Sequence, residues 1–250
     1  MKILPIILLH LVFILFSGYS QKLTIAAASD LKFAMEEIIQ GFQRQNPGSQ
    51  VDAVYGSSGQ FATQIQQGAP FDIFFSADVA YPKELIQKGF AASGLTPYAL
   101  GRIVIWSAME DASLLRLGDL TSPRFAHIAI ANPRHAPYGQ RAQEALTSAG
   151  VGDLVASQLV YGENIAQTAQ FVQTKNAQVG IIALSLVLSP AMAKQGGFYL
   201  IPQEFHTPLE QGFIITLRAK DNALATKFTD FMGTPEVKVI MKRYGFELPE

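Results

Sequence analysis

The stretch Val54-Tyr55-Gly56-Ser57-Ser58-Gly59-Gln60-Phe61-Ala62-Thr63-Gln64-Ile65 (VYGSSGQFATQI) joins two different hydrophobic periodicities. The residues that lead into it, VDAVY, alternate as a β-strand does, and the residues that follow, FATQIQQ, have apolar side chains at helical spacing. The stretch therefore predicts a strand that gives way to a helix, with glycines and small hydroxyl residues at the junction.

The same change from strand to helix recurs along the chain, and this alternation favours an α/β fold. We expect strands at 22–28, 50–55, 71–77, 102–108, 127–131, 157–162, 179–187, 197–202 and 212–219. We expect helices at 31–46, 61–68, 79–89, 140–150, 165–176, 223–233 and 235–246. Two sets of βα units in series, with a return at the end, predict two doubly wound lobes. The carboxyl ends of their strands can then face each other across a cleft.

The first 20 residues have the pattern of a secretory signal peptide. Lys2 precedes an apolar run from Ile3 to Phe16, and small residues follow up to Ser20. A membrane anchor is the alternative, but the run is shorter than the ~20 residues that a spanning helix needs. We expect cleavage near Ser20. The chain has no cysteine, which excludes a lipid-modified N-terminal cysteine and favours a soluble periplasmic protein.

Composition and motifs exclude several function classes. The net charge is −1, so nothing in the charge balance favours nucleic-acid binding. The sequence contains no phosphate-binding glycine-rich loop, no HExxH motif and no thiolate metal site. GSSG at 56–59 is no GxSxG nucleophile motif, because Gln60 occupies the place of the last glycine. A secreted hydrolase that uses Ser58 with His135 remains an alternative.

Four strand-to-helix junctions share small, hydroxyl or glycine residues: AAASD (26–30), YGSSGQ (55–60), APYGQR (136–141) and YGENIA (161–166). A helix start has unpaired backbone N–H groups and carries about half a positive charge, so anions bind there readily. Each junction alone is also explained as an ordinary helix N-cap. The four together, two from each half, predict an anion site in the cleft.

Five segments carry a family resemblance: AAASDLKFAMEEI (26–38), YGSSGQFATQIQQGAPFDIFFSAD (55–78), ANPRHAPYGQRAQEAL (131–146), FVQTKNAQVGI (171–181) and RYGF (243–246). In these segments the sequence resembles the molybdate-binding periplasmic proteins that serve ABC transporters. The resemblance implies a type II periplasmic-binding-protein fold with lobes at 21–101 plus 207–250 and at 102–206, joined by a two-strand hinge. It also implies a monomer that closes over its ligand and delivers it to a membrane permease.

The resemblance further implies a cage of uncharged donors around a tetrahedral oxyanion. Ser29 and Ser58 would donate hydroxyl and backbone N–H groups, and Tyr138 and Ile165 would donate backbone N–H groups. Many relatives add a tyrosine hydroxyl at the position of Ala183. Molybdenum would enter only as molybdate, without a cofactor or catalysis. Tungstate is an expected second ligand, and a carrier of sulfate or another oxyanion is the alternative.

Asp30 is the one acidic residue beside this predicted cage. We expect it to complement the dipole of the helix that follows and to point away from the ligand. A carboxylate acceptor in the cage would suit protonated phosphate and would repel molybdate.

Overall fold

The computed structural model describes residues 22–249. The predicted signal peptide and its cleavage near Ser20 lie outside these residues. Within the described part, no helix combines the length and the apolar character needed to cross a membrane.

The first lobe is built on a five-stranded sheet of order β2-β1-β3-β10-β4. Its strands are β1 (Lys22–Ala28), β2 (Gln50–Gly56), β3 (Ile73–Ser76), β4 (Thr96–Gly101) and β10 (Leu209–Ile215). β1 runs parallel to β2 and β3, and β10 is antiparallel to both of its neighbours. The register pairs Ala28 with Gly56, so the junctions after β1 and β2 lie side by side.

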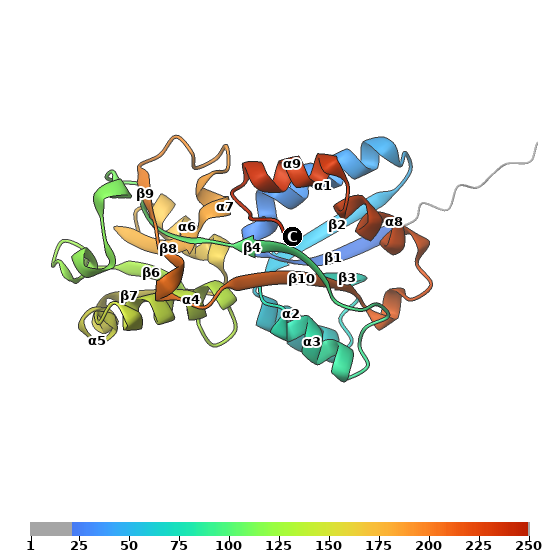
Figure 1. Ribbon diagram of the computed structural model, residues 1–250, viewed down its shortest axis with the longest axis horizontal. Coiled ribbons are helices and arrows are strands. Elements are labelled where there is room, and N and C mark those ends of the chain that lie inside the picture. The colour runs from blue at the N-terminus through green and yellow to red at the C-terminus, as the bar shows by residue number, and fades with distance from the viewer. Residues whose placement is uncertain (1–21, 250) are drawn as a thin grey trace, which may run out of the picture.

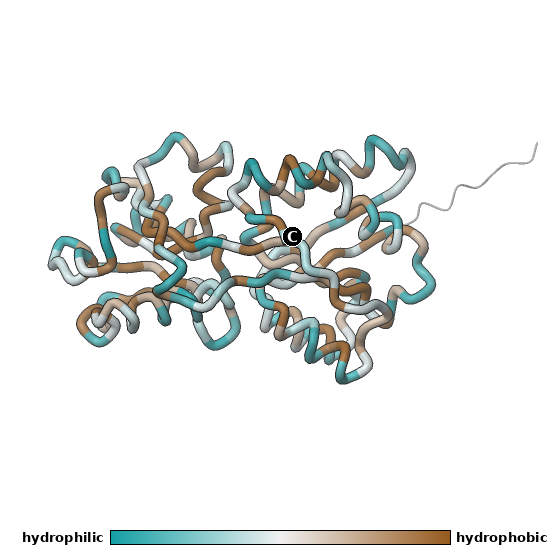
Figure 2. Tube along the Cα trace, in the orientation of Figure 1, coloured by the Kyte–Doolittle hydropathy of each residue, from teal (hydrophilic) through white to brown (hydrophobic). Residues whose placement is uncertain are grey.

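Helices cover both faces of this sheet because the strand side chains are apolar on both sides. The helices are α1 (Lys32–Gln45), α2 (Ser58–Gln66), α3 (Ala80–Gln87), α8 (Ala223–Met232) and α9 (Pro235–Arg243). One face packs Phe75 with Phe42 and Phe228, and the other packs Phe74 with Phe61. Figure 2 shows apolar segments gathered inside the lobe, with hydrophilic segments at the outer turns.

The second lobe has its own five-stranded sheet of order β7-β6-β8-β5-β9. Its strands are β5 (Ile103–Ser107), β6 (Ile128–Ala131), β7 (Leu159–Gly162), β8 (Val179–Ala183) and β9 (Gly197–Leu200). Its helices are α4 (Pro137–Ser148), α5 (Gly152–Val155), α6 (Ile165–Gln173) and α7 (Leu184–Val187). The parallel register of β6 and β7 pairs Ala131 with Gly162, which brings the starts of α4 and α6 together.

The chain crosses between the two sheets twice, from β4 to β5 and from β9 to β10 (Figure 1). The predicted α/β architecture of two doubly wound lobes is confirmed. The exact lobe boundaries at residues 101 and 207 stay a prediction.

Several elements differ from the sequence prediction. The run at 179–187 is a strand only to Ala183 and continues as α7, and the segment predicted as strand 212–219 ends as a strand at Ile215. β4 was not predicted. Helices α2 and α4 each begin three residues before the predicted starts, at Ser58 and Pro137, so the helix N-termini lie inside the glycine-containing junctions.

Candidate functional site

A small cavity lies where the four junctions meet. It has about 190 Å³ of space free of protein atoms, part of it open to solvent. Its lining residues are Ala28, Ser29, Asp30, Gly56, Ser57, Ser58, Ala77, Ala136, Pro137, Tyr138 and Ile165. The structure thus brings together all four residues that sequence reasoning placed in a site, two from each lobe. A larger hollow beside Tyr98 and Lys238 contains none of the four.

On the first lobe, Ser58 begins α2 directly after the strand β2. The side chain is buried, and its Oγ accepts the backbone N–H of Ala77 at 3.0 Å. Because that bond uses Ser58 as an acceptor, its hydroxyl proton remains free for another group. As the first residue of the helix, Ser58 also has a backbone N–H without an intrahelical partner.

Ser29 begins the short 3₁₀-helix η1 (Ser29–Leu31) after β1, and its hydroxyl contacts the opposite lobe. Ser29 Oγ donates to Asn164 Oδ1 at 3.1 Å and accepts the Ala166 N–H at 3.2 Å. Asn164 is the N-cap of α6, because its Oδ1 also accepts the Gln167 N–H at 3.0 Å. A hydrogen-bonded bridge therefore links the end of β1 in the first lobe to the start of α6 in the second lobe.

On the second lobe, Tyr138 is the second residue of α4 and Ile165 is the first residue of α6. Backbone N–H groups at these positions have no intrahelical acceptor. The cavity is lined by no lysine, arginine or histidine. Its positive potential therefore comes from hydroxyl and N–H dipoles at helix starts, which suits an anion.

Asp30 is an exception in this otherwise uncharged lining. It is buried, and its Oδ2 accepts hydrogen bonds from Tyr138 Oη at 3.0 Å and Gln211 Nε2 at 2.8 Å. Its Oδ1 is buried without a hydrogen-bond partner. Burial raises the pKa of this carboxyl to about 6, although Gln211, Tyr138 and the backbone N–H groups of Asp30 and Leu31 oppose the shift. Asp30 is thus a lining residue whose carboxyl group is bonded to Tyr138 of the opposite lobe and to Gln211, and its direction relative to a bound anion stays a prediction.

The Tyr138 phenol has a role that the sequence did not reveal. It donates to Asp30 and accepts from Gln211 Nε2 at 3.1 Å, so its proton is not directed at a ligand. Ala183, where relatives supply a tyrosine, is buried at the end of β8 and is not among the lining residues. Gln211 was missed because a single glutamine in an apolar strand carries no motif.

Further contacts between the lobes surround the cavity. Ser57 Oγ lies 2.8 Å from His135 Nδ1, and the Gly59 N–H donates to the His135 carbonyl at 2.9 Å. Gly59 has to be a glycine here, because a Cβ would lie 2.7 Å from that carbonyl oxygen.

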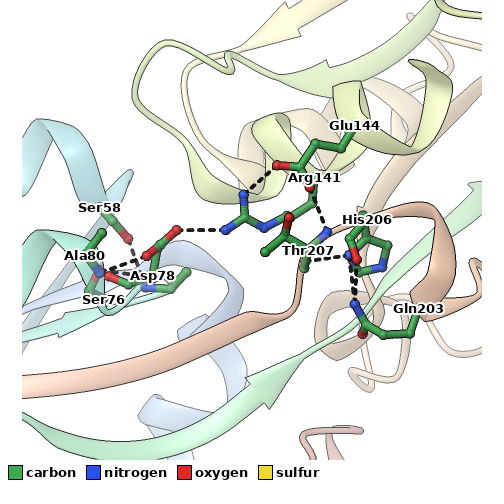
Figure 3. Close-up of polar contacts among 10 residues, drawn as sticks. Ser58, Ser76, Asp78, Ala80, Arg141, Glu144, Gln203, His206 and Thr207 are labelled. Carbon is green, nitrogen blue, oxygen red and sulfur yellow. Dashed lines mark hydrogen bonds and ion pairs between the residues drawn. The ribbon is translucent and has the colours of Figure 1, made fainter. Parts of the chain in front are cut away.

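Arg141 of α4 reaches Asp78 of the first lobe, the residue that follows the lining residue Ala77 (Figure 3). Its Nη2 lies 2.9 Å from Asp78 Oδ2, and its Nη1 donates to Glu144 Oε1 at 2.9 Å. Glu144 in turn accepts the Thr207 N–H at 2.8 Å, in the segment that returns to the first lobe. Ion pairs and a hydrogen bond thus connect α4 to both the first lobe and the crossing segment.

The hydrolase alternative required Ser58 to pair with His135. Instead, His135 contacts Ser57, which is buried, and Ser58 accepts from Ala77. Glu163 lies 3.6 Å from the other ring nitrogen of His135 and its side chain is largely exposed, which is unlike the buried carboxylate that orients a catalytic histidine. Within residues 22–249, no group of three or more His, Cys, Asp or Glu side chains could hold a metal ion.

Comparison with known proteins gives a family match over nearly the whole described chain. Residues 23–247 match the family model described as bacterial extracellular solute-binding protein. The molybdate-binding protein ModA of Rhodobacter capsulatus is 38% identical over 204 residues, which cover 81% of this chain and 79% of the relative. ModA of Azotobacter vinelandii is 34% identical over 233 residues, covering 93% and 92%.

Solved structures agree with this match. The periplasmic molybdate-binding protein of Azotobacter vinelandii superposes with a TM-score of 0.83 at 32% identity, covering 91% of this chain and all of that one. The sulfate-binding protein SubI of Mycobacterium tuberculosis, at 15% identity and a TM-score of 0.73, shares the fold, with 92% of this chain and 88% of that one covered.

Proposed function

The chain belongs to the bacterial extracellular solute-binding proteins, and from that membership we propose that it captures molybdate between its two lobes. Its molybdate-binding relatives match over most of both chains, which supports this choice of ligand. The protein holds the anion without chemical turnover and delivers it to a membrane permease of an ABC transporter. It acts as a monomer in the periplasm after removal of its signal peptide.

One observation of the site carries the proposal: Ser29, Ser58, Tyr138 and Ile165 line a single cavity that has no cationic side chain. In the proposed site, both serines donate hydroxyl and N–H groups, and the other two residues donate backbone N–H groups. Each hydrogen bond to a charged group contributes roughly 1.5–3 kcal/mol, so about six of them support tight binding after the entropic costs.

The donor set recognises a tetrahedral anion by its oxygens, and the size of the cage selects among such anions. Tungstate has nearly the size of molybdate and should bind about as well. Sulfate is smaller and should reach fewer donors at once, so it should bind much less well. A sulfate carrier is the rival within the same class of proteins.

Calorimetric titration of the mature protein with molybdate, tungstate, sulfate and phosphate tests the proposal. We expect similar affinities for molybdate and tungstate, and affinities for sulfate and phosphate that are lower by about a hundredfold or more, because a poor fit leaves donors unpaired. A preference for sulfate over molybdate would refute the molybdate assignment. Hydrolysis of an ester substrate that Ser58→Ala abolishes would refute the carrier function.

A further inference from the structure

Asp30 is a buried carboxylate with one satisfied and one unsatisfied oxygen. The residue is 1% exposed and lines the proposed anion cavity between Ser29 and Tyr138. Its Oδ2 accepts from Tyr138 and Gln211, whereas its buried Oδ1 makes no hydrogen bond of ordinary geometry, although the backbone N–H groups of Asp30 and Leu31 lower the pKa of the carboxyl. An unpaired buried carboxylate oxygen is costly, so this atom requires an explanation.

A bound dianion makes the problem worse. Two negative groups side by side in a partly buried cavity repel each other more strongly than they would in bulk water. The lining contains no cation that could neutralise Asp30, and none of the ion pairs among residues 22–249 includes it. A proton is the one neutralising group small enough to enter without displacing the anion.

We propose that Asp30 is a proton-binding residue of this site, and that capture of a molybdate dianion is accompanied by uptake of one proton from solvent. This inference rests on the proposed function. The proton resides on Oδ1, which turns a buried acceptor into a neutral O–H group beside the anion. Oδ2 remains the acceptor for Tyr138 and Gln211, so the bridge between the lobes persists.

The surroundings of Asp30 support a carboxyl group that changes its charge on binding. Burial raises its pKa to about 6, so the ligand-free carboxyl is mostly ionised at pH 8, and a neighbouring dianion raises the pKa further. The ionisable side chains that face it are Tyr138 of α4 and Tyr98 of β4. Burial raises the pKa of both phenols well above the ordinary value, so they stay neutral. Ser185 of α7 contacts only its backbone carbonyl.

The test is calorimetric titration with molybdate at pH 8 in two buffers of different ionisation enthalpy, because the difference in apparent heat counts the protons taken up. With a free-state pKa of about 6, uptake should be near one proton at pH 8 and about half a proton at pH 6. The affinity of the wild type should fall about tenfold from pH 7 to pH 8, because one proton is linked to binding.

Asp30→Asn should abolish the uptake and the pH dependence, because a neutral amide keeps the size of the side chain without a titrating group. At pH 8 this variant should bind molybdate about tenfold or more tightly than the wild type, since it needs no proton. Asp72→Asn is the matched control: it removes another buried carboxylate of the first lobe that does not line the cavity, and its uptake should equal the wild-type value.

The two proposals fail in different ways. Tight molybdate binding by the wild type without proton uptake would overturn the role of Asp30 and leave the proposed function intact. If the folded Asp30→Asn variant still took up a proton, the proton would belong to another group, and this result would also overturn the role of Asp30. The wild-type measurement decides even if the variant does not fold. An absence of molybdate binding at every pH would refute the proposed function, and the inference with it.

Discussion

At the scale of single residues, the Ser58 hydroxyl has a proton available for an anion. Its Oγ accepts from Ala77, so its own proton remains available. Loss of a hydrogen bond to a charged group costs roughly 1.5–3 kcal/mol, so Ser58→Ala should weaken molybdate binding about ten- to a hundredfold. Calorimetric titration measures the change, and Ser113→Ala, an exposed serine of the second lobe, is the control.

Ser29→Ala should weaken binding over the same range. Its hydroxyl now bridges to Asn164, and it can rotate to donate to a bound anion instead. Wild-type affinity in both serine variants would remove the two hydroxyls from the site.

The two functions of Tyr138, a backbone donor and a phenol that holds Asp30, can be separated. Because the phenol is bonded to Asp30 and Gln211, Tyr138→Phe should bind molybdate within a few-fold of the wild type at pH 6, where Asp30 is half protonated. Tyr138→Pro removes the N–H and should bind poorly. Titration of Tyr138→Phe with molybdate decides, because a loss beyond tenfold would mean that the phenol itself contacts the anion.

Asp30 should also make stability depend on pH. Its folded pKa of about 6 lies above the ordinary 3.8 of an aspartate, so the folded state holds a proton that the unfolded chain has released between these values. Stability therefore falls as pH rises from about 4 to about 6, by up to about 3 kcal/mol, and stays lower above that range.

Asp30→Asn removes this cost. Without ligand, it should raise the free energy of unfolding at pH 8 by as much as about 3 kcal/mol and have little effect at pH 4. Urea denaturation at both pH values measures the difference. An equal effect of the substitution at the two pH values would show that the folded protein does not shift the pKa of this carboxyl.

At the scale of elements, the N-cap of α6 serves both the helix and the site. Asn164 accepts from Gln167 and from Ser29, whereas Asn222 caps α8 far from the cavity by accepting the Leu224 N–H at 3.0 Å. Loss of either cap should cost about 1 kcal/mol of stability. Asn164→Ala should also change molybdate affinity, because it frees the Ser29 hydroxyl and loosens the start of α6.

Thermal unfolding and calorimetric titration of both variants test this difference. Asn222→Ala should retain wild-type affinity. A similar loss of affinity in both variants would mean that the effect is general destabilisation rather than a contact at the site.

Most elements were predictable because their patterns are local. β1 occupies 22–28, as its apolar run predicted, and α6 begins at Ile165, directly after its N-cap asparagine. The run at 179–187 was misread because nine consecutive small or apolar residues fit a buried strand and a buried helix equally well. β4 was missed because its pairing with β10 depends on residues more than a hundred positions later in the chain.

At the scale of the whole molecule, the site was predictable only where it is built from local junctions. Hydroxyl and glycine residues before helices identified Ser29 and Ser58, and the family resemblance supplied Tyr138 and Ile165. The bonds of Asp30 to Tyr138 and Gln211 span 108 and 181 residues, and no local pattern encodes such distances. The contact of Arg141 with Asp78 likewise depends on how the two lobes meet.

The lobes approach each other closely at Gly59, and this contact leads to a last prediction. An added Cβ would lie 2.7 Å from the His135 carbonyl oxygen and 3.0 Å from its Cα in the opposite lobe, and 3.0 Å from Tyr81 Oη in its own lobe. Within its own lobe, Gly59 lies in the first turn of α2, where alanine is a better helix former than glycine. The Tyr81 hydroxyl is the far end of a side chain and can shift, whereas the His135 contacts are backbone atoms. Gly59→Ala should therefore leave the first lobe about as stable as before and hinder mainly closure.

Small-angle X-ray scattering with and without saturating molybdate measures closure as a decrease in the radius of gyration. Gly59→Ala should compact less than the wild type and bind molybdate about tenfold or more weakly, because the variant reaches the closed state at a cost of at least about 1.4 kcal/mol. Gly94→Ala is the matched control, since an added Cβ there meets no atom within 4 Å. Wild-type compaction and affinity in Gly59→Ala would mean that the loaded protein keeps its lobes further apart at His135 than the structure has them.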